Sequence, residues 1–237
     1  MFTRVAEVAD GIYQLTTHID DMNFSFNQYL VTGDEPLLFH TGGRQLFPLV
    51  SEAIEKVTPV ESLRWISFGH VEADESGSMN QFLAQAPQST VTQSVIGCMV
   101  SLGDLADRAP KPLADGEVLD IGGHRMRWID TPHLPHGWEA GIMYDETTKT
   151  LLCGDLFTQN GAFDPTSDAD VVGPAIEAED IYGAMSLHPS SGARLRELAE
   201  LDIERLALMH GPVFGGDCKQ ALVDLAGEVD RRVAAVA

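Results

Sequence analysis

The stretch HVEADESGS runs from His70 to Ser78 and follows the apolar segment LRWISF, residues 63–68, which is typical of a buried strand. Three potential metal ligands, His70, Glu72 and Asp74, stand at every second position of this stretch. In an extended loop this alternation aims three side chains in one direction, which it would not do on a helix. One imidazole and two carboxylates form a hard, oxygen-rich set that suits iron or manganese better than structural zinc. A solvated acidic loop would show the same pattern, so other residues must decide.

Further His and Asp residues stand where later predicted strands end. They are His133 and His136 after the strand predicted over residues 124–129, Asp155 after the strand over 150–153, and His210 after the strand over 206–209. In proteins that combine helices and strands, ligands cluster where strand ends emerge into loops. The recurrence at four strand ends therefore favours one shared metal site over isolated packed or solvated histidines.

The whole chain predicts short strands and helices in two runs. Strands are expected over residues 11–16, 26–31, 36–40, 63–68, 90–95, 117–121, 124–129, 141–144, 150–153 and 206–209, and helices over 46–57, 78–84, 97–105, 178–187, 193–201 and 219–236. Because each run of strands is followed by helices, the simplest layering is an α+β fold in which two mixed β-sheets pack together with helices outside. With 237 residues and no linker-like segment, we expect a single domain over residues 1–237.

The chain carries 15 Lys and Arg against 36 Asp and Glu, a formal net charge of −21. This excess of acid argues against nucleic acid or an anionic membrane as a partner, because both bind basic surfaces. The three cysteines, Cys98, Cys153 and Cys218, are too sparse for a disulfide framework or a zinc knuckle and are expected to be buried. The N-terminus shows no signal-peptide pattern and no segment has transmembrane length, so we expect a cytoplasmic protein.

Taken in order along nearly the whole chain, these motifs resemble the metallo-β-lactamase superfamily. The usual first motif of that superfamily is His-x-His-x-Asp-His, and Glu72 replaces its second histidine here. This replacement is similar to the di-iron branch, which contains the flavodiiron oxygen and nitric oxide reductases and the related oxygen-binding di-iron proteins. Asp155 in LLCGDLF and His210 in LMHGPVF resemble the bridging aspartate and final histidine of that branch. The resemblance implies the metallo-β-lactamase fold, a four-layer αβ/βα sandwich of two mixed β-sheets flanked by helices.

The resemblance also implies two iron ions, with zinc or manganese as alternatives, and a set of ligands for them. One iron would take His70, Glu72 and His136, the other would take Asp74 and His210, and Asp155 would bridge the two. His136 is preferred over His133 because it lies eight residues before Tyr144, as the ligand of the family lies before its next strand. The histidine left over would stand behind the ligands or in the pocket wall.

Several residues near these motifs have more than one interpretation. The flavodiiron reductases carry a histidine directly after the aspartate of the motif, where this chain has Glu75. Glu75 is expected to be an acceptor behind the ligands or a surface acid rather than a seventh ligand. His40 stands where many relatives carry aspartate and could hydrogen-bond a ligand, while Trp138 and Phe157 either wall a gas pocket or are core aromatics. The remaining histidines are assigned no ligand role; they are His18 and His188 in loops and His124, which is expected in solvent.

The flavodiiron reductases fuse this domain to a flavodoxin-like domain, for which we expect no room after the closing helix, and the chain has no four-cysteine iron site. We therefore expect no flavin on this chain, and reduction would need an external electron donor such as a separate flavoprotein. The resemblance implies a non-haem di-iron protein that binds dioxygen for sensing or delivery, or that reduces dioxygen or nitric oxide with such a donor. The alternative is a dinuclear zinc hydrolase that activates water. A metal-free scaffold comes third, and the sequence leaves a homodimer open.

Overall fold

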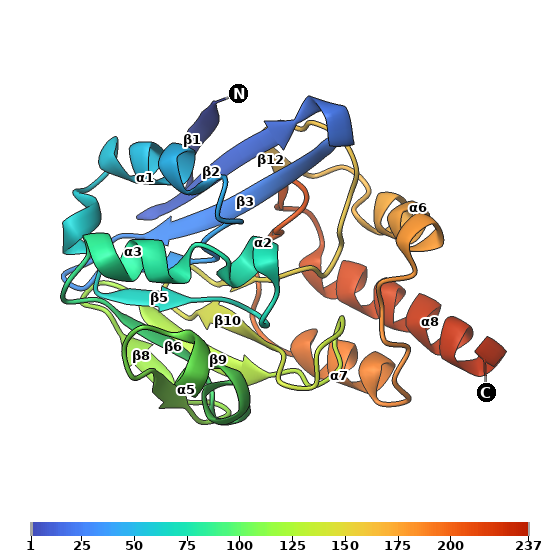
Figure 1. Cartoon of the computed structure of the whole chain (residues 1–237). Helices are drawn as coiled ribbons and strands as arrows, with labels where there is room; N and C mark the ends of the chain where they lie inside the picture. The colour runs from blue at the N-terminus through green and yellow to red at the C-terminus, as the bar shows by residue number, and fades with distance from the viewer. Residues whose placement is uncertain (1, 237) are drawn as a thin grey trace.

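The structure, a computed structural model, describes residues 2–236, which form two seven-stranded β-sheets packed face to face (Figure 1). The first sheet follows chain order and consists of β1 Thr3–Ala9, β2 Ile12–Ile19, β3 Phe24–Val31, β4 Leu37–Phe39, β5 Trp65–Ser67, β6 Thr90–Ser94 and β7 Lys111–Leu113. The second has the order β12-β14-β13-β11-β10-β9-β8 and consists of β8 Val118–Asp120, β9 Arg125–Asp130, β10 Gly141–Asp145, β11 Thr150–Leu152, β12 Thr166–Ser167, β13 Arg205–Ala207 and β14 Val213–Phe214. Both sheets combine parallel and antiparallel neighbours, so the predicted pair of mixed sheets is confirmed.

Helices cover the outer face of each sheet. Those along the first sheet are α1 Phe47–Glu55, α2 Ala73–Ser76 and α3 Met79–Gln85, and those along the second are α6 Val172–Tyr182, α7 Ser191–Leu198 and α8 Cys218–Val236 (Figure 1). Short helical turns complete the set; they are η1 Asp20–Met22, η2 Val60–Ser62, α4 Val95–Gly97, the π-helical turn η3 Cys98–Leu102, and α5 Gly103–Leu105. The layers therefore run helix, sheet, sheet, helix, as the sequence predicts.

Apolar residues that alternate along the buried strands build this layering. Leu30 of β3 packs outward in a cluster with Ile54 of α1, whereas its neighbour Val31 packs between the two sheets. In the second sheet Leu152 of β11 joins the same central cluster, and its neighbour Leu151 packs outward against α6, α7 and α8. Because successive side chains of a strand point to opposite faces, a strand that is covered on both faces needs an uninterrupted apolar run. These runs made the central strands predictable.

Several elements differ from their predicted bounds. Four strands were not predicted. β1, β7 and β12 lie at sheet edges and β14 has only two residues, so none of them has the long apolar run that marks a central strand. The helix predicted over residues 178–187 is wrong in its bounds. It is α6, which stops at Tyr182 because Gly183 adopts a left-handed conformation with φ of +59° that closes the helix. The helix predicted over residues 97–105 is divided among α4, η3 and α5.

Two expectations about side-chain burial have opposite outcomes. The three cysteines are buried and free, as predicted. The expectation that His124 lies in solvent is wrong: it is buried, and its Nδ1 lies 2.8 Å from Asp145 Oδ2. The physical reason is the pairing of β9 with β10, which brings His124 beside a carboxylate that is fully buried and therefore needs donors.

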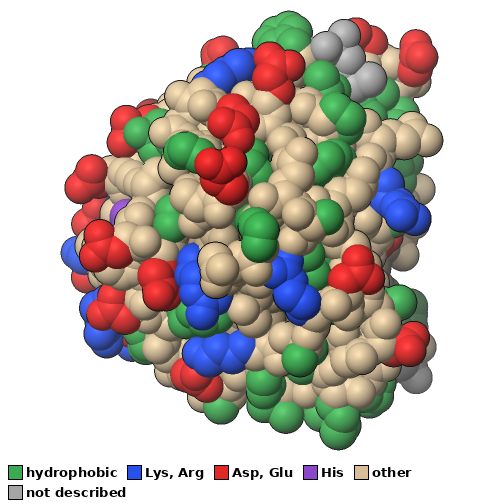
Figure 2. Space-filling view, turned by 60° about the vertical axis from the view of Figure 1, so that its left-hand side comes forward, with side chains coloured by type: hydrophobic (Ala, Val, Ile, Leu, Met, Phe, Trp, Pro, Cys, Tyr) green, Lys and Arg blue, Asp and Glu red, His purple; other side chains and the backbone are tan. Residues whose placement is uncertain are grey.

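The surface carries the excess of acid that the composition indicates. On the face shown in Figure 2, Asp and Glu side chains are spread over the surface, and Lys and Arg side chains lie between them, both near the centre of the view and at its edges. No helix within residues 2–236 is long and apolar enough to cross a membrane.

Candidate metal centre

The six side chains singled out in the sequence come together at the ends of four strands. His70 and Glu72 follow β5, His136 follows β9, Asp155 follows β11, His210 follows β13, and Asp74 lies in the first turn of α2. The expectation of an extended loop throughout the first motif is wrong for Asp74, because the chain is extended at Glu72 and turns into α2 at Ala73. The expected convergence of strand ends nevertheless appears in the folded chain.

A first group of potential ligand atoms surrounds Glu72. Its Oε2 lies 2.8 Å from His70 Nε2 and 3.0 Å from His136 Nε2. The same two imidazole nitrogens each lie 3.6 Å from Asp155 Oδ2. One potential ligand atom from each of these four residues lies within 4.8 Å of the others, so together they could hold one metal ion.

A second group lies on the other side of Asp155. His210 Nε2 lies 3.3 Å from Asp155 Oδ1 and 3.4 Å from Asp74 Oδ2. The other ring nitrogen, Nδ1, donates to the backbone carbonyl of Ser25 at 2.9 Å. This hydrogen bond keeps a proton on Nδ1, so Nε2, which faces the carboxylates, is the nitrogen that could bind a metal ion.

Asp155 presents one carboxylate oxygen to each group. Oδ2 faces His70 and His136, whereas Oδ1 faces His210. Oδ1 is buried and accepts no hydrogen bond. A buried carboxylate oxygen without a donor is costly unless a cation satisfies it. A metal ion on each side of Asp155 would satisfy both oxygens, so the residues present fit a two-metal group.

The carboxylates also shift the protonation of the metal-free histidines. Burial lowers the pKa of His70, but the negative charges of Glu75 and Glu72 outweigh this effect and raise the pKa to about 12. Burial opposes the same change at His210, where Asp155 raises the pKa to about 10. The hydrogen bond with His70 lowers the pKa of Glu72 to about 2. The carboxylates of the cluster are therefore balanced by positive charge, which protons on the histidines supply when metal ions do not.

Glu75 is not a surface acid, because its side chain is fully buried. Oε2 accepts a hydrogen bond from the backbone N–H of His70 at 2.7 Å, and Oε1 lies 3.4 Å from both His70 Nδ1 and His40 Nε2. The surface interpretation fails because the turn of α2 directs Glu75 inward while Asp74 faces the cluster. His40 contacts Glu75 rather than one of the six clustered side chains.

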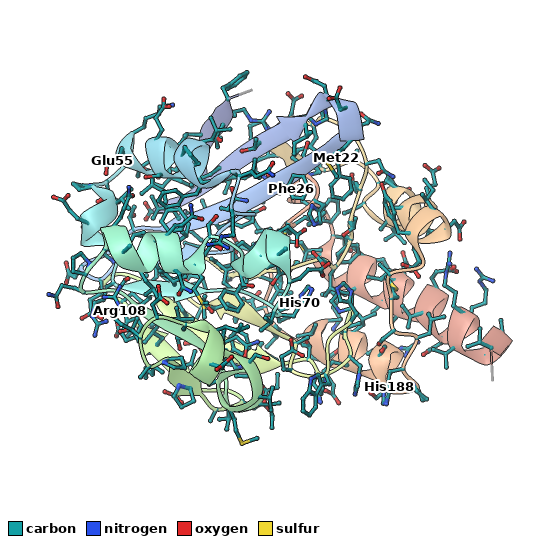
Figure 3. All side chains as sticks on the ribbon, viewed as in Figure 1. Met22, Phe26, Glu55, His70, Arg108 and His188 are labelled. Carbon is teal, nitrogen blue, oxygen red and sulfur yellow. The ribbon has the colours of Figure 1, made fainter. Side chains whose placement is uncertain are left out.

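A cavity of about 300 Å³ opens beside the cluster. Its polar wall is formed by Glu72, Asp74, His136, Asp155, Thr158, Glu179 and His210. The rest of the wall is apolar apart from the Tyr182 hydroxyl, and it consists of Met22, Phe24, Phe26, Pro135, Ala175, Ala178, Tyr182, Ala184 and Met185. Figure 3 labels Met22 and Phe26 above His70, on the side of the molecule where β3 runs past the cluster. The cluster is thus reached through a mostly apolar pocket.

The two aromatic residues expected near this pocket do not line it. Trp138 is 58% exposed, and Phe157 is fully buried in the core between the second sheet and α6, α7 and α8. The gas-pocket interpretation is therefore wrong for both, and only Phe157 is a core aromatic. The ring of His210 instead packs against Phe24 and Phe26, with centroid distances of 4.5 and 5.3 Å. These two residues were not predicted, because β3 is far from the motifs in the sequence.

Of the two histidines in the loop after β9, the structure brings His136 into the cluster and places His133 outside it. His133 stacks on His188, with ring centroids 4.6 Å apart and an interplanar angle of 13°. His18 also lies outside the cluster, with its Nδ1 2.9 Å from Ser25 Oγ. These three histidines therefore contact residues outside the cluster.

Hydrogen bonds between loops and strands hold the clustered residues in place. Tyr29 Oη and Asn27 Nδ2 of β3 donate to the backbone oxygen of Leu208 at 2.6 and 2.8 Å, which ties the second sheet to the first beside His210. The N–H of Gln159, in the loop after β11, donates to the carbonyl of His210 at 2.7 Å. The cluster is therefore built on strand ends that are fixed to one another.

Solved structures with this fold include flavodiiron proteins. Rubredoxin oxygen:oxidoreductase from Desulfovibrio gigas superposes with a TM-score of 0.83 at 18% identity, over 94% of this chain and 62% of that one. A fragment of putative diflavin flavoprotein A 5 from Nostoc sp. PCC 7120 gives a TM-score of 0.83 at 18% identity, over 99% of this chain and 98% of the fragment. The fold is thus the metallo-β-lactamase core of the flavodiiron proteins, as predicted.

The match to a family model agrees with this class. A model described as ODP family beta lactamase matches residues 24–211, which contain every residue of the cluster, and the chain belongs to this family. Putative diflavin flavoprotein A 2 of Nostoc sp. (strain PCC 7120) is 26% identical over 197 residues, which are 80% of this chain and 34% of that protein. The chain therefore spans about a third of the length of the diflavin flavoproteins it matches.

Proposed function

We propose that this chain holds two iron ions and binds dioxygen, or reduces dioxygen or nitric oxide with an external electron donor. The proposed ligands are His70, Glu72 and His136 for one ion, Asp74 and His210 for the other, and Asp155 for both. The name of one structural neighbour, a rubredoxin oxygen:oxidoreductase, supports the reaction class. The assignment to this chain rests on the cluster itself.

The observation that carries the proposal is the two-sided contact of Asp155. Its Oδ2 approaches the histidines of the first group at 3.6 Å, and its Oδ1 approaches His210 at 3.3 Å. A carboxylate that joined only one metal would leave its second oxygen without a cation in a buried position. Two metals bridged by one carboxylate account for both contacts.

Glu72 supports iron over zinc. It lies against both histidines of the first group, where the hydrolases of the superfamily use a neutral imidazole. A negative ligand at this position reduces the charge available to acidify a metal-bound water, which a hydrolase needs. It also favours hard, redox-active metals. Iron is therefore the proposed metal, with manganese and zinc as alternatives.

The cavity supports a small apolar substrate. Its mostly apolar walls exclude polar competitors and lead to the clustered residues, so a diatomic gas can reach the centre. Iron held there would supply electrons and open coordination positions for the gas. The role of the protein itself is to hold the ions with fixed histidines and carboxylates and to keep the cavity that leads to them apolar. The electrons would come from a separate donor such as a flavoprotein.

The test is metal analysis combined with optical spectra, on protein purified from iron-supplemented medium. We expect two irons per chain and a visible absorption band that bleaches on anaerobic reduction and returns with air. Zinc without a visible band, together with hydrolysis of an ester or thioester, would support the hydrolase instead. Protein that retains no metal would refute both.

Binding and reduction are separated by the fate of the gas. Dioxygen that is recovered unchanged when the protein is degassed indicates reversible binding. Continuous consumption of dioxygen or nitric oxide in the presence of a reduced flavoprotein indicates turnover. The unaltered protein and the Asp155→Ala variant should be compared in the same assay, because the reduced donor alone also reacts with dioxygen.

A further inference from the structure

Glu75 lies behind His70, on the side away from the other clustered ligands, and its carboxylate is fully buried. Oε2 accepts a hydrogen bond from the backbone N–H of His70 at 2.7 Å. Oε1 lies 3.4 Å from His70 Nδ1 and 3.4 Å from His40 Nε2, but it accepts no hydrogen bond. Three nitrogens thus converge on one carboxylate. A glutamine could not serve all three, because its amide nitrogen cannot accept a hydrogen bond.

The backbone forms a close-fitting site around this carboxylate. A Cβ atom at Gly69 would lie 3.2 Å from Glu75 Oε2, and one at Gly154 would lie 3.4 Å from Oε1. Gly154 also has a φ of +54°, a conformation that favours glycine. The N–H and hydroxyl of Thr41 donate to the backbone oxygen of Glu75 at 2.6 and 3.0 Å. Both ends of the Glu75 residue are therefore held at fixed positions.

The two ring nitrogens of His70 face different partners. Nε2 lies 2.8 Å from Glu72 and 3.6 Å from Asp155, whereas Nδ1 faces Glu75. A histidine that binds a metal through one nitrogen carries its proton on the other, and the acceptor of that proton fixes the tautomer and the ring orientation. Glu75 is placed to be this acceptor.

His40 stands next to Glu75 and completes the arrangement. It is fully buried, its ring lies against Phe39 at a centroid distance of 4.4 Å, and neither ring nitrogen makes a hydrogen bond. A neutral imidazole can donate one N–H to Glu75 without cancelling its negative charge. His40 can therefore hold the carboxylate while leaving it an effective acceptor for His70.

We infer that Glu75, supported by His40, is a positioning residue that holds His70 with Nδ1 protonated and Nε2 directed at the metal. The inference rests on the proposed metal centre and adds a task for two residues outside the ligand set. A carboxylate behind a metal-bound histidine raises the basicity of the ligand, and its removal weakens metal binding by about 10- to 100-fold. Its loss should also raise the midpoint potential of the metal that His70 binds, because less negative charge then stabilises the oxidised ion.

The variant Glu75→Gln tests this with Co²⁺ alone as the probe. Co²⁺ is titrated anaerobically into chelator-treated full-length protein and followed by visible absorption. One of two Co²⁺ equivalents is expected to bind about 10- to 100-fold more weakly, and the other is expected to bind as in the unaltered chain. In the iron-loaded protein, one of the two midpoint potentials should shift upward.

The matched control is Glu139→Gln. Glu139 is also a buried glutamate that accepts a backbone N–H from the same loop, that of Val71 at 3.1 Å. Within residues 2–236 no ion pair joins it to a clustered histidine. A general disturbance of the loop should therefore appear in both variants, whereas an effect through His70 should appear only in Glu75→Gln.

A second pair of variants keeps the inference testable if Glu75→Gln does not fold. His40→Leu removes the donor to Glu75, and His40→Gln keeps an N–H group in its place. The same Co²⁺ equivalent is expected to weaken in His40→Leu and to be retained in His40→Gln. Thermal unfolding of the metal-free proteins identifies a variant that has lost its fold.

Two results would overturn the inference. One is unchanged affinity for both Co²⁺ equivalents in Glu75→Gln. The other is that Glu75→Gln and Glu139→Gln weaken the binding of both Co²⁺ equivalents to the same extent. The inference and the proposed function fail in different ways. Iron-loaded protein that does not respond to dioxygen or nitric oxide would refute the function and leave the Co²⁺ result standing. Unaltered Co²⁺ affinity in Glu75→Gln would refute the positioning role in a chain that still holds two irons.

Discussion

Asp155 Oδ1 lies 3.3 Å from His210 Nε2, and the other oxygen of the same carboxylate turns away toward His70 and His136. Because one side chain serves both groups, Asp155→Ala is expected to reduce the metal content from two ions per chain to nearly none. The measurement is elemental analysis of the purified variant, together with its free energy of unfolding. Asp164→Ala, which removes an exposed aspartate from the same long connection after β11, should keep both metals. One metal retained in Asp155→Ala would contradict the bridging role.

Glu72 is the residue on which the choice of metal depends, since its Oε2 lies against two histidine nitrogens. Glu72→His replaces a negative ligand with a neutral one. We expect the iron-to-zinc ratio to fall when the protein is produced with both metals supplied equally, because the site then carries less negative charge to stabilise oxidised iron. Glu177→His, on the exposed face of α6, is the control and should leave the ratio unchanged. An unaltered ratio in Glu72→His would contradict the dependence of the metal choice on Glu72.

The sequence predicted the loops of the cluster better than the side chains around it. His70, Asp155 and His210 each follow a strand with a visible apolar run, so their places follow from the ends of those strands. The cavity wall does not follow in this way. Phe24 and Phe26 belong to β3, and their contact with His210 depends on how one sheet packs on the other, which no local pattern encodes.

The burial of charged and polar groups was also difficult to predict from the sequence. Glu75 stands in an acidic run that resembles a surface loop, and only the turn at the start of α2 directs it toward His40. His124 follows a glycine turn that resembles an exposed hairpin, and only the pairing of β9 with β10 brings it to Asp145. Burial of such groups depends on donors and acceptors from distant segments, so it becomes visible only in the folded chain.

His136 and His133 are three residues apart on one loop, but only His136 reaches Glu72, at 3.0 Å. His136→Ala is therefore expected to weaken one of the two metal equivalents and to spare the other. His133→Ala breaks the stacking on His188 and should keep the affinity for both. Competition titrations against a chromophoric chelator measure both affinities. Equal losses in the two variants would contradict the assignment of His136 as the ligand.

The pair His124 and Asp145 lies at the far end of β10 from the loop that carries His136, so it should affect stability and not metal content. Burial alone would raise the pKa of Asp145, but hydrogen bonds from His124 and Thr148 outweigh it and lower the pKa below its ordinary value. A carboxyl group with a lowered pKa in the folded state stabilises the fold above its unfolded pKa of about 3.9. This contribution is lost as the pH falls through the folded pKa.

Asp145→Asn is therefore expected to lower the free energy of unfolding by about 1–3 kcal/mol at neutral pH, because hydrogen bonds to a buried charge are lost. The difference from the unaltered chain should shrink as the pH falls below about 4, where the unfolded carboxyl group takes up its proton. Denaturant unfolding of the metal-free proteins at several pH values measures this. Asp120→Asn, at an exposed aspartate of β8, should change the free energy by less than about 0.5 kcal/mol at every pH. A loss in Asp145→Asn that stays the same from neutral to acidic pH would show that the charge of Asp145 contributes nothing.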